Sequence, residues 1–200
     1  MKDSISNTQV NTSVFQKTKP GNRVCGDSYL VVETEDFFLC SVTDGLGSGE
    51  GARQSAEIAM NIIRAHKHES IPMLLERCNR ALVSERGVVL AIIKVCYQEQ
   101  ELTYGSIGNI TCYISADNEE IFRPIPTKGY LSGRKFQYRL EYVPFDKGIS
   151  FVLHSDGMTV SSEDQRALPR MRSVEEYKNK LAEKAENEND DVTLMVGALG

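Results

Sequence analysis

The middle of the chain places the strongest constraint on the fold. Residues 87–155 show no helical period and contain a succession of β-rich runs: GVVLAIIKVCY, ELTYGSIG, ITCYIS, EIFRPI, FQYRLEYV and ISFVLHS. Strands that follow one another without intervening helices favour antiparallel pairing. The runs at 37–42, 88–93 and 149–153 are apolar at almost every position, which indicates that both sheet faces are covered. We therefore predict an α+β fold, a four-layer α/β/β/α sandwich of two mainly antiparallel sheets flanked by helices.

Helices are expected on either side of this β-rich region. Residues from about 48 to 66 carry an apolar stripe, and a second helical pattern begins at a Ser70 cap. A third helix begins with the capping box Ser173-x-x-Glu176. Strands are predicted at about 8–17, 27–34 and 37–44, and again in the last run, DVTLMVGAL. A chain of 200 residues is expected to form one domain, 1–200.

Composition excludes several classes of function. The chain is 40% hydrophobic and 26% charged, and its net charge of -5 argues against nucleic-acid or anionic membrane partners. No apolar run reaches the roughly 18 residues of a membrane span, and the polar start predicts no signal peptide. Five cysteines without a C-x-x-C pair indicate free thiols rather than a zinc site. We expect a cytoplasmic protein.

One glycine-rich loop, SVTDGLGSGEG at 41–51, allows two interpretations. Gly47, Gly49 and Ala52 fit the G-x-G-x-x-A spacing of a dinucleotide-binding turn. That site requires a parallel βαβ unit and an acidic residue at the end of a second strand, whereas Glu69 falls at the end of a helix. The alternative is a metal site. Asp44 lies at the strand tip, where in a dinucleotide site its negative charge would face an anionic phosphate.

The pairing of two predicted strands places two acids together. A two-residue turn at Glu35 and Asp36 pairs 27–34 with 37–44, so Asp27 lies opposite Asp44. Directly opposed carboxylates repel each other unless a cation lies between them. This register is the first indication of a metal site.

Two further acidic positions lie at strand ends. Asp156 follows the strand ISFVLHS, and Asp190 and Asp191 precede the last strand. Neighbouring antiparallel strands bring the end of one strand beside the start of the other, so these acids are expected at one edge of the sandwich. Oxygen ligands without His or Cys favour Mg²⁺ or Mn²⁺, and the number of carboxylates favours two ions.

These motifs, in this order, resemble those of the metal-dependent type 2C serine/threonine protein phosphatases. The likeness is greatest to the bacterial branch that dephosphorylates regulators of alternative sigma factors. It rests on CGDS, VTDGLGSG, YGSIGN, LHSDG and DDVTL, and a likeness to stress-pathway feedback phosphatases rests on ERCNRA, GNI and GYLSG. The resemblance implies the α/β/β/α sandwich and hydrolysis by direct attack of hydroxide on phosphorus, without a phosphoenzyme.

The resemblance also implies roles for individual residues. Asp44 would bridge two Mn²⁺ or Mg²⁺ ions, and the Gly45 carbonyl would ligate one of them. Asp156 and Asp190 would complete the ligand set, and Asp27 would orient, or accept a proton from, a metal-bound water. Catalytic roles are thus expected for Asp27, Asp44, Asp156 and Asp190.

The sequence departs from the family pattern at several positions. Many members bind phosphate through an arginine at the place of Asn22, and the neighbouring Arg23 is either a substitute or an ordinary surface arginine. Asp191 replaces a common Asn and is expected only in a supporting position behind the ligands. Asn109 stands where relatives with a third metal have Asp, so two ions are expected. GYLSG at 129–133 is either a loop that gates substrate or a glycine turn between strands.

By resemblance, the partners are phosphorylated scaffold and antagonist proteins of the stressosome, and dephosphorylation would provide negative feedback on the general stress response. We expect a monomer. Two rival interpretations are a two-metal phosphodiesterase or nuclease, which the acidic charge disfavours, and a binding module with a degenerate site. A degenerate site would lack one of the strand-end aspartates, and none is missing.

Overall fold

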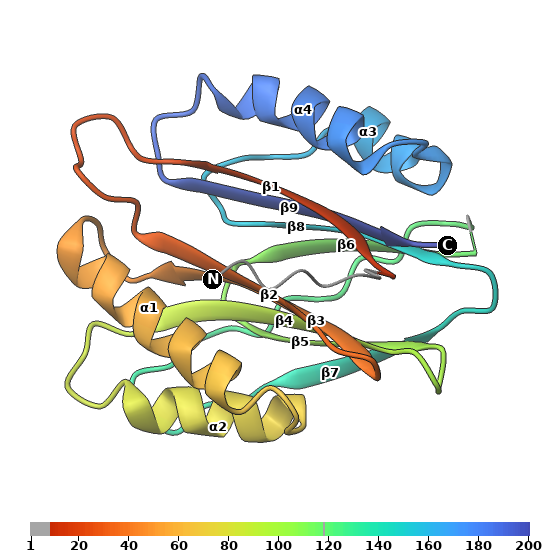
Figure 1. The fold of residues 1–200 in the computed structure, drawn as a ribbon. Helices are drawn as coiled ribbons and strands as arrows, with labels where there is room; N and C mark the ends of the chain where they lie inside the picture. The colour runs from red at the N-terminus through yellow and green to blue at the C-terminus, as the bar shows by residue number, and fades with distance from the viewer. Residues whose placement is uncertain (1–8, 118) are drawn as a thin grey trace, which may run out of the picture.

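The computed structural model describes residues 9–117 and 119–200, which form two antiparallel sheets with helices on both outer faces (Figure 1). The first sheet has the order β1-β9-β8-β6, made of β1 (Asn11–Lys17), β9 (Val192–Leu199), β8 (Ile149–His154) and β6 (Thr111–Ala116). The second has the order β2-β3-β4-β5-β7, made of β2 (Asp27–Glu33), β3 (Phe37–Gly45), β4 (Val88–Cys96), β5 (Glu101–Ile107) and β7 (Arg139–Pro144). The predicted four-layer sandwich is confirmed.

The helices cover the two sheets separately (Figure 1). α1 (Glu50–Ala65) and α2 (Ile71–Ala81) pack on the second sheet. α3 (Ser162–Ala167), the 3₁₀ turn η1 (Leu168–Arg170) and α4 (Val174–Ala185) pack on the first sheet. In the part of the chain that the structure describes, every helix is too short or too polar to cross a bilayer.

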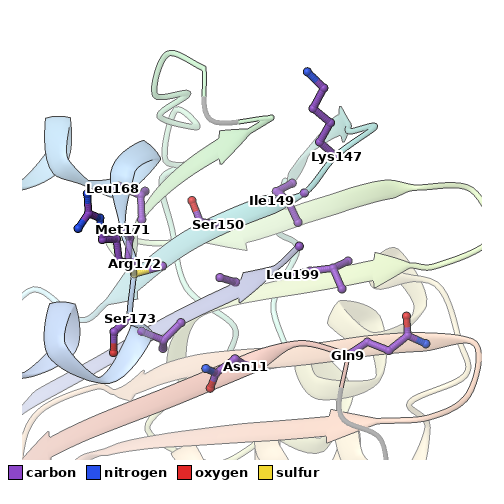
Figure 2. A pocket seen from close by; sticks show the side chains of 14 residues that line it. Gln9, Asn11, Lys147, Ile149, Ser150, Leu168, Met171, Arg172, Ser173 and Leu199 are labelled. Atoms are coloured by element: carbon purple, nitrogen blue, oxygen red, sulfur yellow. The ribbon is translucent and has the colours of Figure 1, made fainter.

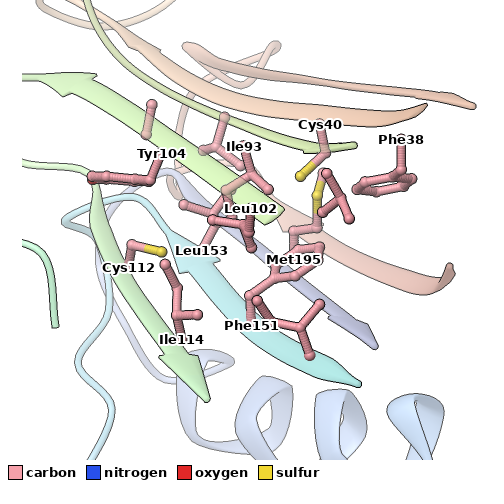
Figure 3. Packing of buried hydrophobic residues seen from close by; sticks show 14 of the residues in the cluster. Phe38, Cys40, Ile93, Leu102, Tyr104, Cys112, Ile114, Phe151, Leu153 and Met195 are labelled. Atoms are coloured by element: carbon pink, nitrogen blue, oxygen red, sulfur yellow. The ribbon is translucent and has the colours of Figure 1, made fainter. Parts of the chain in front are cut away.

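Burial on both faces explains the continuous apolar strands. In β3, Phe38 and Cys40 face the core between the sheets, whereas Phe37 and Leu39 face α1 and α2. The first set lies among large side chains from both sheets, including Phe151, which packs against Phe38 with ring centroids 5.9 Å apart (Figure 3). Because successive strand residues point to opposite faces, a strand buried on both sides needs apolar residues at every position.

The helix ends agree with the predicted caps. Ser70 is the N-cap of α2, and the Ser173 side chain accepts a hydrogen bond from the Glu176 backbone N–H at the start of α4. All five cysteines are free thiols, as predicted, and four of them are buried. Position 8, where the first strand was predicted to begin, lies outside the described residues.

Two features differ from the sequence prediction. The run EIFRPI is not a strand, because only Phe122 forms a bridge, to Ile114, and the two following prolines, Pro124 and Pro126, have no N–H to donate. The short helix α3 was not predicted. It is capped by Ser161, whose hydroxyl accepts from the Asp164 N–H, and its polar sequence has no apolar stripe.

Candidate metal centre

The hairpin between β2 and β3 has the predicted register. The Thr34 N–H donates to the Phe37 carbonyl at 2.9 Å, and Asp27 pairs with Asp44 directly across the hairpin. Asp27 is only 1% exposed and Asp44 is half-buried. Two carboxylates are therefore held side by side at the open end of the hairpin.

The ends of β8 and β9 lie together in the first sheet. Beyond the paired strands, the Ser155 N–H donates to the Thr193 carbonyl at 3.0 Å, and the Thr193 N–H donates to the Ser155 hydroxyl at 2.9 Å. Asp156 follows Ser155, and Asp191 lies two residues before Thr193. This pairing brings the second set of acidic residues to one sheet edge, as the sequence predicted.

Asp191 joins the two sheets at this edge. Its Oδ2 accepts from the Gly26 N–H at 2.8 Å, and its Oδ1 accepts from the Lys19 N–H at 2.7 Å. Both oxygens of a buried carboxylate are thus engaged by backbone of the segment that leads into Asp27. This arrangement fits the supporting position expected for Asp191.

The two glycines that follow strand-end aspartates permit close backbone packing. A β-carbon at Gly45 would clash with the backbone of Ala52 in the first turn of α1, and one at Gly157 would clash with the backbone of Asp191. Any larger residue would push these segments apart. The repeated Asp-Gly pattern therefore sets the closeness of the chain segments around the carboxylates.

Electrostatics at this edge favour a bound cation. Burial, together with the nearby carboxylates of Asp27, Asp156, Asp190 and Asp191, raises the pKa of Asp44 to about 8. Burial also raises the pKa of Asp27 to about 6, although the hydroxyls of Ser155 and Thr193 partly oppose the shift. The Oδ2 atom of Asp27 is buried and has no hydrogen-bond partner among the described residues. A divalent cation would remove the repulsion and supply a partner for this oxygen.

The more exposed acids have other partners. Asp156 Oδ2 accepts from the Asn109 side chain at 2.6 Å, and Asp190 lies 3.1 Å from the Lys19 ammonium. Within residues 9–117 and 119–200, no three acidic, His or Cys side chains are gathered tightly enough to hold an ion. Asp156 and Asp190 are solvent-exposed, so rotation of their side chains toward Asp44 displaces little packing. The donor set, oxygen-only and strongly anionic, fits Mg²⁺ or Mn²⁺.

The dinucleotide interpretation of the glycine-rich loop is wrong. β3 lies between β2 and β4 and is antiparallel to both, so no parallel βαβ unit surrounds the loop. The loop instead turns directly from Asp44 into α1.

One basic side chain near this edge was not identified from the sequence. Arg23 is exposed and has no ion-pair partner among the described residues, and the Asn22 amide nitrogen is buried without a hydrogen-bond partner there. Sequence reasoning missed Arg86, whose guanidinium packs against Gly47 and Gly51 and donates to the Ser48 carbonyl at 3.1 Å. Its position follows from the pairing of β3 with β4, which begins two residues later. A basic residue just before a strand that neighbours Asp44 was the available signal.

The segment GYLSG pairs with the start of β4. Leu131 and Val88 exchange two backbone hydrogen bonds, of 2.9 and 3.0 Å. This segment therefore lies beside the turn at Gly87, whose carbonyl accepts from the Leu46 N–H just after Asp44-Gly45. A gating role for GYLSG stays a prediction.

A separate hollow of about 310 Å³ lies at the opposite end of the first sheet (Figure 2). Its lining includes Ile149, where β8 begins, and Leu199, where β9 ends. The carboxylates described above lie where β8 ends and β9 begins, so this hollow is not part of the candidate metal centre.

Comparison with known proteins agrees with this geometry. Residues 35–198 match the family model described as Stage II sporulation protein E (SpoIIE). The chain is 33% identical, over 193 residues and 96% of both chains, to the phosphoserine phosphatase RsbX of Bacillus subtilis (strain 168).

Solved structures give the same result. A crystal structure of RsbX in complex with magnesium matches with a TM-score of 0.89, 33% identity and 96% coverage of each chain. A chain from a study of the bacterial stressosome, described as a modular system adapted to control secondary messenger signalling, matches at 27% identity with a TM-score of 0.84, over 94% of this chain and 98% of that one. The catalytic domain of the phosphatase PstP, in complex with two manganese ions, has the same fold at 17% identity, with a TM-score of 0.73 and coverage of 96% and 99%. The chain therefore belongs to the SpoIIE family and has the fold of the PP2C-type phosphatases.

Proposed function

We propose that this chain is a metal-dependent phosphatase that removes phosphate from serine or threonine of stressosome and sigma-factor regulatory proteins. The observation that carries the proposal is the placement of strand-end aspartates from both sheets at the edge that holds Asp44, where burial and these carboxylates raise the pKa of Asp44 to about 8. The 33% identity to a phosphoserine phosphatase over 96% of both chains supports the same reaction. The cofactors are two Mn²⁺ or Mg²⁺ ions.

We assign the ligands by placement. Asp44 would bridge the two ions, the Gly45 carbonyl would bind one, and Asp156 and Asp190 would complete the set. Asp191 would hold the Lys19–Gly26 segment through its two backbone hydrogen bonds. When bound, the ions supply Lewis-acid activation of water and neutralise phosphate charge.

The chain's own residues then position and deprotonate the nucleophile. Asp27 is 1% exposed and its pKa is raised to about 6, so its carboxylate is suited to accept a proton near neutral pH. Arg86, beside the loop that follows Asp44, is a better-placed candidate than Arg23 to hold the phosphate oxygens.

We further propose one phosphatase domain spanning residues 1–200, acting as a monomer in the cytoplasm. Its substrates would be phosphorylated scaffold and antagonist proteins of the stressosome, and its action would provide negative feedback on the general stress response. The support is the match to RsbX and to a chain from the bacterial stressosome study.

Phosphate release from an aryl phosphate and from phosphorylated stressosome proteins tests this function. Activity should require Mn²⁺ or Mg²⁺, disappear in excess chelator and return when Mn²⁺ is restored. Full activity in chelator would overturn the metal mechanism. Hydrolysis of an aryl phosphodiester in preference to the monoester would favour the phosphodiesterase alternative.

A further inference from the structure

An unusually basic segment lies beside the candidate metal centre. Residues 122–139 contain five of the chain's 23 basic residues and none of its 28 acidic residues: Arg123, Lys128, Arg134, Lys135 and Arg139. All five are exposed, and none forms an ion pair within residues 9–117 and 119–200. The whole chain has a net charge of -5, so this segment is positively charged within an acidic protein. We name residues 122–139 the basic strip.

The strip also exposes large apolar side chains. Ile125 is 65% exposed, and Tyr130 and Tyr138 are each 42% exposed. Two adjoining hollows of about 510 and 420 Å³ lie along the strip and share Phe136 and Gln137 in their walls. Exposed aromatic and arginine side chains beside hollows are the composition typical of protein-binding surfaces.

The rest of the molecule holds the strip in place although most of the strip lies outside regular strands. The buried Asn79 of α2 donates to the Arg134 carbonyl at 2.9 Å and accepts from the N–H groups of Ser132 and Gly133, at 3.1 and 2.9 Å. The Leu131–Val88 bridge anchors the same region to β4. A surface fixed in this way binds with a smaller entropic cost than a loop that must order on binding.

The strip is continuous with the metal centre at two points. The Gly108 N–H donates to the Thr127 carbonyl at 2.7 Å, and the next residue, Asn109, contacts Asp156. Tyr130 packs against Gly87, which is hydrogen-bonded to the loop after Asp44. A protein whose phosphoserine reached Asp44 would therefore bring its neighbouring surface onto the strip.

From this placement we infer that the basic strip docks an acidic surface of the folded phosphoprotein substrate, next to its phosphoserine. The inference rests on the proposed phosphatase function and adds the chemistry by which the substrate is recognised. Positive charge on the strip attracts the acidic partner, and the exposed apolar side chains bury area once it is bound. Small aryl phosphates reach only the metal centre and do not use the strip.

A charge variant tests the inference. The variant combines Arg134→Gln, Lys135→Gln and Arg139→Gln in one protein, which removes three positive charges from residues 134–139 of the strip. A matched control combines Arg64→Gln, Lys147→Gln and Arg172→Gln, three exposed basic residues outside the strip, and gives the same net charge. The substrates are an aryl phosphate and a folded stressosome scaffold protein phosphorylated on serine.

We expect the strip variant to lower kcat/KM for the phosphoprotein about tenfold, mainly through KM, and to change aryl phosphate hydrolysis less than twofold. The control should stay within about twofold of wild type on both substrates. Raising the salt concentration should remove most of the difference between wild type and strip variant. The substitution Ile125→Ser should lower phosphoprotein turnover in the same selective way without changing charge.

Unchanged phosphoprotein turnover by both the charge variant and Ile125→Ser would overturn the inference, as would an equal loss in the control. Binding to phosphatidylserine vesicles is measured in parallel, because an anionic membrane could also bind a basic surface. The inference fails if the charge variant loses vesicle binding but keeps its phosphoprotein turnover. If wild type hydrolyses neither substrate with Mn²⁺ present, the proposed function itself fails. Hydrolysis of the aryl phosphate, which does not use the strip, thus shows whether a loss of phosphoprotein turnover comes from docking or from catalysis.

Discussion

Two aspartates of this molecule lie in opposite electrostatic surroundings. Asp164 in α3 is fully buried and lies 3.0 Å from the Lys180 ammonium, 2.5 Å from that of Lys184 and 2.5 Å from the Ser161 hydroxyl. Burial raises its pKa, but these hydrogen bonds outweigh burial and hold the pKa at about 2. Burial, together with the charges of nearby carboxylates, raises the pKa of Asp44 to about 8.

The difference distinguishes a carboxylate that stabilises the fold from one that is arranged for function. The partners of Asp164 are the N-cap residue of α3 and two lysines of α4, so its charge joins two helices on one outer layer. Within residues 9–117 and 119–200, no lysine, arginine or histidine forms an ion pair with Asp44, so we expect its charge to be compensated by a cation that the chain binds. Strongly perturbed carboxylates of this second kind cluster at functional sites.

The largest expected effect comes from Asp44→Asn. This change keeps the shape of the side chain but removes its charge from the ion-binding site, so kcat on aryl phosphate should fall about 10³-fold, equivalent to roughly 4 kcal/mol. The companion change Asp164→Asn should leave kcat of the folded enzyme within about twofold of wild type. Turnover by Asp44→Asn close to that of wild type would remove Asp44 from the mechanism.

Asp164→Asn should instead reduce stability. Loss of two charge-assisted contacts to a buried group should lower the free energy of unfolding by about 2 kcal/mol, measured by urea denaturation with Mn²⁺ present. A matched change at an exposed carboxylate, Glu175→Gln, should have a much smaller effect, because the Glu175 side chain is 63% exposed. Equal stability of Asp164→Asn and wild type would show that this buried cluster contributes nothing.

The two aspartates also predict opposite pH dependence in metal-free protein. The pKa of Asp44 is raised from the ordinary value of 3.8 to about 8 in the folded state. Between about pH 4 and pH 8, Asp44 is therefore protonated in the folded protein and ionised in the unfolded chain. Stability should therefore fall as pH rises across this window. Asp164 has a lowered pKa, so its contribution is present above about pH 4 and is lost as pH falls toward 2.

Urea midpoints of chelator-treated protein at pH 5.5 and pH 8 test the part of this prediction that concerns Asp44. Wild type and Asp164→Asn should both be less stable at pH 8, and Asp44→Asn should show a smaller decrease. Saturating Mn²⁺ should reverse the decrease in wild type. A metal-free wild type that is more stable at pH 8 than at pH 5.5 would contradict the assignment.

The smallest effect is expected at Lys19, whose ammonium lies 3.1 Å from Asp190. Both side chains of this ion pair are well exposed, so Lys19→Ala should change stability by less than about 1 kcal/mol. Because the lysine competes with a cation for Asp190, the substitution should raise Mn²⁺ affinity by about two- to threefold. A decrease in Mn²⁺ affinity would show that Lys19 supports the site in another way.

Much of the candidate site could be predicted from the sequence because its residues lie at strand ends. The Asp27–Asp44 register follows from a two-residue turn at 35–36, and strand pairing alone brings Asp156 near Asp191. The burial of β3 and β4 on both faces could be predicted from their unbroken apolar runs.

Other features depend on tertiary contacts that leave no local pattern. The short helix α3 is held by ion pairs from α4, twenty residues away in the case of Lys184, and not by an apolar stripe. Arg86 lies 38 residues after Ser48 in the chain and reaches the glycine-rich loop because β4 pairs with β3. The basic strip is visible as composition, but its contacts with Gly87 and Gly108 required the fold.

Calorimetric titration of Mn²⁺ into chelator-stripped protein tests the central claim most directly, namely that the carboxylates around Asp44 form a two-ion site. We predict that wild type and Asp164→Asn bind two ions per chain, and that Asp44→Asn loses high-affinity binding of both. The account would be contradicted if wild type bound no Mn²⁺, or if Asp44→Asn bound two ions as tightly as wild type.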